Sequence, residues 1–160
     1  MPQAPPVDKP VSLRRAVLLR DFTDVGVKIL AEIAEQRSVG QGTFAFKAGD
    51  ASDALSFVAE GTLHLVPHEG GAALGEVTVG DSVGGMSLLV EGEHLLSALA
   101  ATDVELLEIS RAAFEEMKRT HPRTALKLTL ALAQDLAERL REAKGPLREF
   151  LVWQISKRQS

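Results

Sequence analysis

Glycines divide the middle of this chain into short apolar runs, and this spacing restricts the fold more than any other feature of the sequence. Runs of this length between turns are typical of strands in a small antiparallel barrel or sandwich. The turns fall at Gly42, Gly49, Gly61, Gly70 with Gly71, Gly80, Gly84 with Gly85, and Gly92. We therefore predict strands over residues 43–46, 55–59, 62–66, 72–77, 95–101 and 105–109, with "HEGG" (68–71) as a hairpin loop.

A helical pattern precedes this region. Over residues 12–39 apolar side chains recur at spacings of three and four, which predicts two helices. Thr23 or Asp24 is a plausible N-cap for the second of them.

Helical texture returns after the last predicted strand. It covers residues 111–120, with Ser110 as a natural N-cap, and residues 122–144, where Pro122 suits the first turn. The predicted fold class is therefore mainly β with flanking helices. We expect a double-stranded β-helix or jelly-roll-like β-roll, with N-terminal helices and a long C-terminal helix.

Length and composition limit the organisation of the chain. A chain of 160 residues with 45% hydrophobic character forms one core, but hardly two domains. We predict a domain over residues 12–144, after a disordered, proline-rich leader (1–11) and before an amphipathic C-terminal segment (145–160).

Charge and residue types exclude several function classes. A net charge of −4 offers no field to hold a polyanion, so we expect no nucleic-acid partner. The chain has no cysteine, which rules out disulfides and thiolate chemistry. The sequence also has no long apolar stretch and no secretory signal, so we expect a cytoplasmic protein without a membrane partner.

The long C-terminal helix carries two apolar stripes. Five residues alternate four and three apart, as in a coiled-coil seam: Leu126, Leu130, Ala133, Ala137 and Leu140. Leu128, Leu132 and Leu136 recur every four residues on a neighbouring face. Either the helix packs only on its own barrel, or the seam meets a partner chain. The second interpretation predicts a homodimer or docking to another protein. For the closing segment we expect one of two arrangements, folding back onto the domain or docking to a partner; its apolar residues are Leu147, Phe150, Leu151, Trp153 and Ile155.

Several motifs, in the same order along the chain, resemble the cyclic nucleotide-binding domain of catabolite-activator-type regulators. "FKAGD" (46–50) resembles the family's F-x-x-G-D turn, and "FVAEGTLHLV" (57–66) resembles its next hairpin. "LGEVTVGDSVGGMSLL" (74–89) and "DVELLEIS" (103–110) extend the match. The resemblance covers about residues 13–144 and implies the same β-roll fold.

The resemblance also implies a ligand site. In the family, a short helix presents backbone N–H groups to a cyclic phosphate, a glutamate binds the ribose hydroxyl, and an arginine binds the phosphate. Gly84 keeps the glycine turn, and the short helix corresponds to Met86, Ser87 and the two leucines that follow. We call residues 84–89 the cassette segment. The glutamate position is Gly85, which leaves the pocket either filled or enlarged.

The arginine of the family is missing as well. Its position corresponds to His94, followed by Leu95 and Leu96 in place of smaller residues, and no arginine occurs between Arg37 and Arg111. Removing one partner of a buried charge pair typically costs roughly 3 to 5 kcal/mol, or about two to four decades of affinity. By the same alignment, Arg139 and Leu140 would lie near a bound base.

These substitutions favour a regulatory, non-enzymatic domain that serves as a scaffold or protein-interaction module. We expect no cofactor and weak or no binding of cAMP or cGMP. The alternative is a genuine cyclic nucleotide or small-anion sensor that uses the backbone N–H groups of residues 84–87, with protonated His94 supplying charge.

The sequence favours neither an enzyme nor a DNA-binding regulator. It shows no nucleophile, base and orienter together. His64 and His68 near Glu69 fall on a strand and in a turn, so we expect no metal site. The residues after Gly145 are too few for a helix-turn-helix module.

Overall fold

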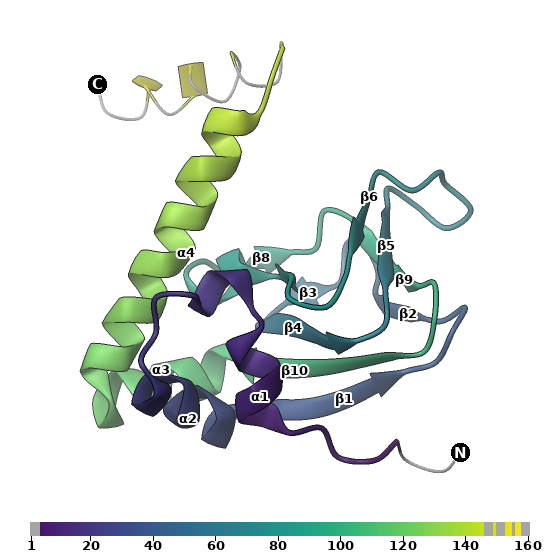
Figure 1. The fold of residues 1–160 in the computed structure, drawn as a ribbon. Coiled ribbons are helices and arrows are strands. Elements are labelled where there is room, and N and C mark those ends of the chain that lie inside the picture. Colours follow the sequence, from purple (N-terminus) through teal and green to yellow (C-terminus); the bar gives the residue numbers. More distant parts are fainter. Residues whose placement is uncertain (1–3, 146–148, 150–152, 155, 158–160) are drawn as a thin grey trace.

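The computed structural model describes residues 4–145, 149, 153–154 and 156–157. Figure 1 shows a β-roll with helices gathered along one side, and α4 extending past the roll toward the C-terminus. In chain order the elements are α1 (Lys9–Arg14), η1 (Val17–Leu19), α2 (Asp24–Ile33), β1 (Glu35–Val39), β2 (Phe44–Phe46), β3 (Ala51–Ser52), β4 (Ala54–Glu60), β5 (Leu63–Val66), β6 (Gly75–Val77), β7 (Ser82–Val83), η2 (Gly85–Leu88), β8 (Gly92–Glu93), β9 (Ser97–Ala100), β10 (Val104–Ser110), α3 (Arg111–Thr120) and α4 (Pro122–Glu142).

Two four-stranded antiparallel sheets form the roll. Their strand orders are β1-β10-β4-β7 and β2-β9-β5-β6, and β3 pairs with β8 as a separate two-stranded ladder. Non-consecutive strands lie side by side in both sheets, as expected when a chain winds into a roll. The predicted fold class is therefore confirmed: an antiparallel β-roll with helices before and after it.

Side-chain alternation along the strands produces two cores. On β10 and β4, Leu106 and Val58 point into the roll and belong to the core between the two sheets. Leu107 and Phe57 point to the other face and pack against the helices. The central sheet is therefore buried on both faces, which fixes the helices against the roll.

The predicted helix starts are confirmed. The Thr23 hydroxyl accepts a hydrogen bond from the Gly26 N–H at 3.1 Å and caps α2. Ser110 caps α3 through the Ala113 N–H at 3.0 Å. Pro122 opens α4 as predicted. A side-chain cap supplies an acceptor to an N–H that the helix itself leaves unpaired.

The end of the predicted N-terminal helical region is wrong. Residues 35–39 form β1, which pairs with β10 so that Val39 lies opposite Val104. Its sequence, "EQRSV", has no apolar residue before Val39, so the helical spacing over residues 12–39 does not extend through it. Partners on a distant strand, rather than local propensity, decide its conformation.

Smaller differences concern the leader and the shortest strands. Residues 9–11, expected in a disordered leader, belong to α1, because Asp8 caps that helix through the Val11 N–H at 3.1 Å. The two-residue strands β3, β7 and β8 were not predicted. The expected strands 72–77 and 95–101 shorten to β6 and β9.

Most of the predicted C-terminal segment lies outside the described residues, including Leu147, Phe150, Leu151 and Ile155. Among the helices that the structure does describe, none combines the length and the apolar character needed to cross a membrane.

Candidate functional site

The cassette segment begins with a turn that only glycine accommodates. Gly84 has a φ of +78°, in the left-handed region. A Cβ atom there would lie 2.4 Å from the backbone oxygen of Ala54. The turn leads into η2, a 3-10 helix that begins one residue earlier than the predicted helix.

The space next to Gly85 is filled by α4. A Cβ atom on Gly85 would lie 2.7 Å from Cδ2 of Leu132 and 3.9 Å from Cδ1 of Leu55. Leu132 is 6% exposed and belongs, with Leu55 and Leu88, to the core between the roll and the helices. Leu132 therefore occupies the space immediately next to Gly85. α4 packs directly on the residue that corresponds to the family's glutamate.

Arg111, which was not among the residues predicted from the sequence, binds the backbone of the cassette segment. The Arg111 guanidinium donates to the backbone oxygens of Ser87 at 2.6 Å and of Ser52 at 2.9 Å. Ser87 is buried, and its hydroxyl shares a hydrogen bond with that of Ser52. These hydrogen bonds tie η2 and β3 to the start of α3, and Arg111 Nη1 also lies 3.9 Å from Glu91 Oε1.

The His94 side chain stacks on an aromatic neighbour. Its ring lies parallel to that of Phe46, with centroids 3.7 Å apart and an interplanar angle of 8°. Its backbone N–H donates to the Asp50 oxygen at 2.8 Å, which joins it to the turn that follows β2. Burial lowers the pKa of His94 below its ordinary value of 6.5, against the opposing effect of Asp50 and Asp53. Burial therefore disfavours the charged form of His94.

This pKa shift predicts a loss of stability in acid. Since the folded state binds the His94 proton more weakly than the unfolded state, stability is complete above the ordinary pKa of 6.5 and falls as pH drops below it. We expect His94→Phe, which keeps a ring against Phe46, to lose less unfolding free energy than the wild type between about pH 7.5 and about pH 5.5. Urea unfolding at both pH values measures this, and equal losses would contradict it.

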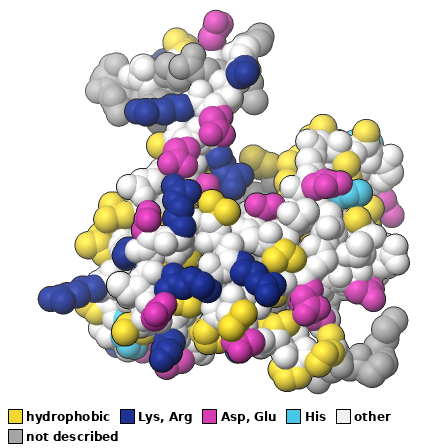
Figure 2. Space-filling model, viewed as in Figure 1, with side chains coloured by type: hydrophobic (Ala, Val, Ile, Leu, Met, Phe, Trp, Pro, Cys, Tyr) yellow, Lys and Arg dark blue, Asp and Glu magenta, His cyan; other side chains and the backbone are white. Residues whose placement is uncertain are grey.

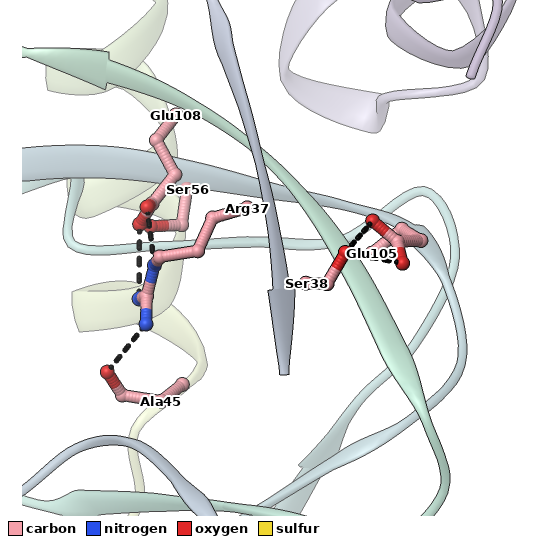
Figure 3. Close-up of polar contacts among 6 residues, drawn as sticks. All are labelled: Arg37, Ser38, Ala45, Ser56, Glu105 and Glu108. Atoms are coloured by element: carbon pink, nitrogen blue, oxygen red, sulfur yellow. Dashed lines mark hydrogen bonds and ion pairs between the residues drawn. The ribbon is translucent and has the colours of Figure 1, made fainter. Parts of the chain in front are cut away.

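A polar cluster lies in the roll interior beside His94. Arg37 Nε donates to Glu108 Oε1 at 2.6 Å and Arg37 Nη2 to Glu108 Oε2 at 3.2 Å, a two-pronged ion pair (Figure 3). The Ser56 hydroxyl donates to the same carboxylate at 2.6 Å, and Arg37 Nη1 donates to the Ala45 oxygen at 3.0 Å. The Glu108 carboxylate thereby neutralises the guanidinium of Arg37, whose side chain is 41% exposed.

A second carboxylate, that of Glu105, is hydrogen-bonded on the opposite face of β1. There the Ser38 hydroxyl donates to Glu105 at 2.7 Å, as Figure 3 also shows. Neighbouring residues of a strand point to opposite faces, so this pair does not contribute to the roll interior.

The Arg37–Glu108 pair predicts a moderate cost for removing the cation. Because the Glu108 side chain is only 19% exposed, Arg37→Met leaves a carboxylate poorly solvated, and we expect a loss of about 2 kcal/mol in unfolding free energy. Pairing Arg37→Met with Glu108→Gln should restore part of the loss. Guanidinium unfolding of the three variants tests this, and a double variant less stable than Arg37→Met would contradict it.

The structure places the predicted site residues on several elements. β8, which pairs with β3, lies between the cassette segment and His94 along the chain. Leu95 is 90% exposed, and Leu96 is half-buried. Met86 is also exposed.

On α4, the two residues aligned with the base-binding positions differ in their surroundings. Arg139 pairs with Asp135 one turn earlier, at 2.8 Å, and is largely exposed. Leu140, the last residue of the seam, is half-buried. Among the described residues, the hydrogen bond and ion pair of Arg139 go to Asp135 and not to the cassette segment.

Sequence reasoning missed Arg37, Glu108 and Arg111. A strand assignment for residues 35–39 would have placed Arg37 on the same face as Val39, and hence inside the roll. Nothing in the local sequence of Arg111 indicates its backbone contacts, because the acceptors lie on η2 and β3.

Comparison with known proteins agrees with this architecture. The family model for the cyclic nucleotide-binding domain matches residues 36–121, which is more than half of the chain. The Cyclic AMP receptor protein of Thermus thermophilus is 39% identical over 107 residues, covering 65% of this chain and 50% of that protein. The crystal structure of Thermus thermophilus Catabolite Activator Protein superposes with a TM-score of 0.70 at 34% identity, covering 84% of this chain and 62% of that one.

A third relative is a much longer protein than this chain. Lysophospholipase nte1 of Aspergillus fumigatus is 30% identical over 137 residues, which is 80% of this chain but 9% of that protein. The chain thus spans half or less of the length of these two curated relatives. The shared part is the β-roll domain with its flanking helices, and the chain belongs to the cyclic nucleotide-binding domain family.

Proposed function

We propose that this chain is a non-enzymatic, cytoplasmic regulatory module that acts as a dimeric scaffold and binds cAMP and cGMP weakly or not at all. The observation that carries the proposal is the contact between α4 and the cassette segment. Leu132 occupies the space that a side chain at position 85 would enter. A carboxylate for the ribose hydroxyl is therefore absent, and its place is already part of the apolar core.

The charges near the roll support the same proposal. A cyclic phosphate needs a cation that is free to pair with it. Arg37 is neutralised by Glu108, Arg111 lies 3.9 Å from Glu91 and also binds backbone carbonyls, and burial lowers the pKa of His94 and so disfavours its charged form. None of these three side chains offers a free positive charge to an anion in the cassette segment.

The proposed dimer uses the seam of α4. Leu128 and Leu132 are buried against the chain's own core, whereas Leu126 is 61% and Leu130 54% exposed. Ala133 and Ala137 continue the exposed stripe. A stripe with alternating spacings of four and three is complementary to a second copy of itself, because each side chain fits between those of the facing helix.

The flanking charges favour a parallel arrangement of the two α4 helices. On one side of the seam lie Lys127, Gln134 and Arg141, and on the other side Thr129 and Leu136. An antiparallel pair would place Lys127 near Arg141 of the second copy, whereas a parallel pair places these cations next to neutral side chains. We therefore propose a parallel, two-fold symmetric dimer.

Two observations favour a second candidate, a nucleotide or small-anion sensor. The Gly84 turn is retained, and no side chain caps η2, so backbone N–H groups remain at its start. The Thermus thermophilus relative is named as a Cyclic AMP receptor protein. On this alternative, ligand binding would have to displace Leu132 and move α4.

Sedimentation velocity of the purified chain, with and without about millimolar cAMP, tests the proposed function. The scaffold predicts a dimer at micromolar concentration in both samples, because the seam does not depend on the cassette segment. A monomer in both samples would contradict the proposed dimer. A dimer that appears only with cAMP would favour the sensor.

A further inference from the structure

A groove between α2 and the start of α4 lies away from the cassette segment and has a volume of about 660 Å³. Its apolar part comes from Phe22, Val25, Ile29 and Pro122. Val25 is 68% exposed, although it stands in the first turn of an otherwise well-packed helix. Apolar side chains exposed in a groove of this size are typical of sites that bind another apolar group.

The polar lining of the same groove is basic. It includes His121, Arg123 and Lys127, and no carboxylate belongs to the lining. Among the described residues, no acidic side chain lies within ion-pair distance of Arg123 or Lys127. This is unusual in a chain of net charge −4. In the view of Figure 2, Lys and Arg side chains gather over the helices, whereas Asp and Glu side chains are spread over both halves of the molecule.

Two contacts fix the position of the Lys127 ammonium group in the groove. This group donates to the backbone oxygen of Asp21 and lies 5.3 Å from the centre of the Phe22 ring. Both contacts orient the side chain without neutralising it, since neither partner carries a negative charge. The positive charge therefore stays in place beside the apolar floor.

The start of α4 adds to the positive potential. His121 provides no side-chain cap, and the first turn contains no acidic residue. The first N–H groups of the helix, which an acidic or hydroxyl side chain usually pairs, are left to an outside acceptor. Arg123 and Thr124 belong to this turn and line the groove.

From the apolar floor with its exposed Val25, the unpaired cations and the uncapped helix start, we infer that this groove docks an acidic, apolar segment of a partner protein. Apolar side chains of the segment pack against Val25 and Ile29, and its carboxylates face Arg123 and the start of α4. A second copy of this chain fits poorly, since a symmetric contact would bring two basic grooves together. The inference does not depend on what occupies the cassette segment.

The test uses the full chain and a labelled probe peptide made of leucine, alanine and glutamate, with leucines three and four residues apart. Fluorescence anisotropy should show saturable binding that weakens with added salt. A matched peptide with glutamine in place of every glutamate should bind about tenfold more weakly or worse. Amide chemical shifts should change at Val25, Gly26 and Arg123.

Two variants locate the contact. We expect each variant to weaken binding of the acidic probe about tenfold or more. Arg123→Glu reverses a charge of the groove. Val25→Glu adds a negative charge in the first turn of α2, where an acidic side chain is compatible with the helix dipole. Arg15→Glu, an exposed arginine outside the groove, is the matched control and should bind as the wild type does. Lack of binding of the acidic probe, equal affinity for the glutamine peptide, or shift changes on the α4 seam instead would overturn the inference.

Discussion

Replacing Gly85 by glutamate should destabilise the domain by about 3 kcal/mol and should not create nucleotide binding. The new Cβ would lie 2.7 Å from Cδ2 of Leu132, so Leu132 has to move within a close-packed core. The carboxylate would then be buried between Leu55 and Leu132 without a donor. The residue type that the family uses here is therefore harmful in this chain. Chemical unfolding followed by circular dichroism measures the change.

A double-variant cycle attributes this cost to the contact with α4. Leu132→Ala alone should cost about 3 kcal/mol through the cavity it leaves. The double variant should lose less unfolding free energy than the sum of the two single-variant losses, because alanine vacates the space that glutamate needs. Gly92→Glu is a suitable control, since nothing lies within 4 Å of a Cβ at that position. Additive costs, or a stable Gly85→Glu variant that gains cAMP affinity, would count against this account.

The second large effect concerns association. Leu130→Glu should raise the dissociation constant of the proposed dimer about a hundredfold or more, because both copies bring the charge to the same seam. Since Leu130 is 54% exposed in the single chain, the stability of the monomer should change little. Sedimentation velocity over a dilution series gives the dissociation constant.

A matched variant separates the seam from general surface effects. Leu74→Glu changes a leucine that is also more than half exposed, at 67%, in the loop before β6 and far from α4 in Figure 1. It should dimerise as the wild type does. If Leu74→Glu rather than Leu130→Glu disrupts association, the dimer uses the roll instead of the seam.

The fold was predictable because its signals are local. Glycine at positions such as Gly84 and Gly61, where φ is positive and a Cβ would meet backbone, marks turns that the strands need. Ser110 and Thr23 mark helix starts through their own side chains. The segment 35–39 shows the limit, since its strand conformation depends on pairing with β10, far away in the sequence.

The site was less predictable because it depends on contacts between distant segments. The sequence indicated that Gly85 lacks the family's carboxylate, but not that Leu132 takes the space. It suggested that His94 could carry charge, yet the stack on Phe46 and the burial that lowers its pKa appear only in the folded chain. The alternation of β1 places Arg37 inside the roll, where Glu108 on β10 neutralises it.

The central claim concerns the two things that a cyclic nucleotide would need, space beside Gly85 and a free positive charge. In this chain α4 takes the space, and ion pairs take the charge. Isothermal titration of the wild-type chain with cAMP and with cGMP, at about pH 6 and about pH 8, tests it most directly. We predict no saturable heat up to about millimolar nucleotide at either pH. Saturable binding with a dissociation constant below about 100 μM would contradict the claim, and binding that is stronger at the lower pH would identify His94 as the cation responsible.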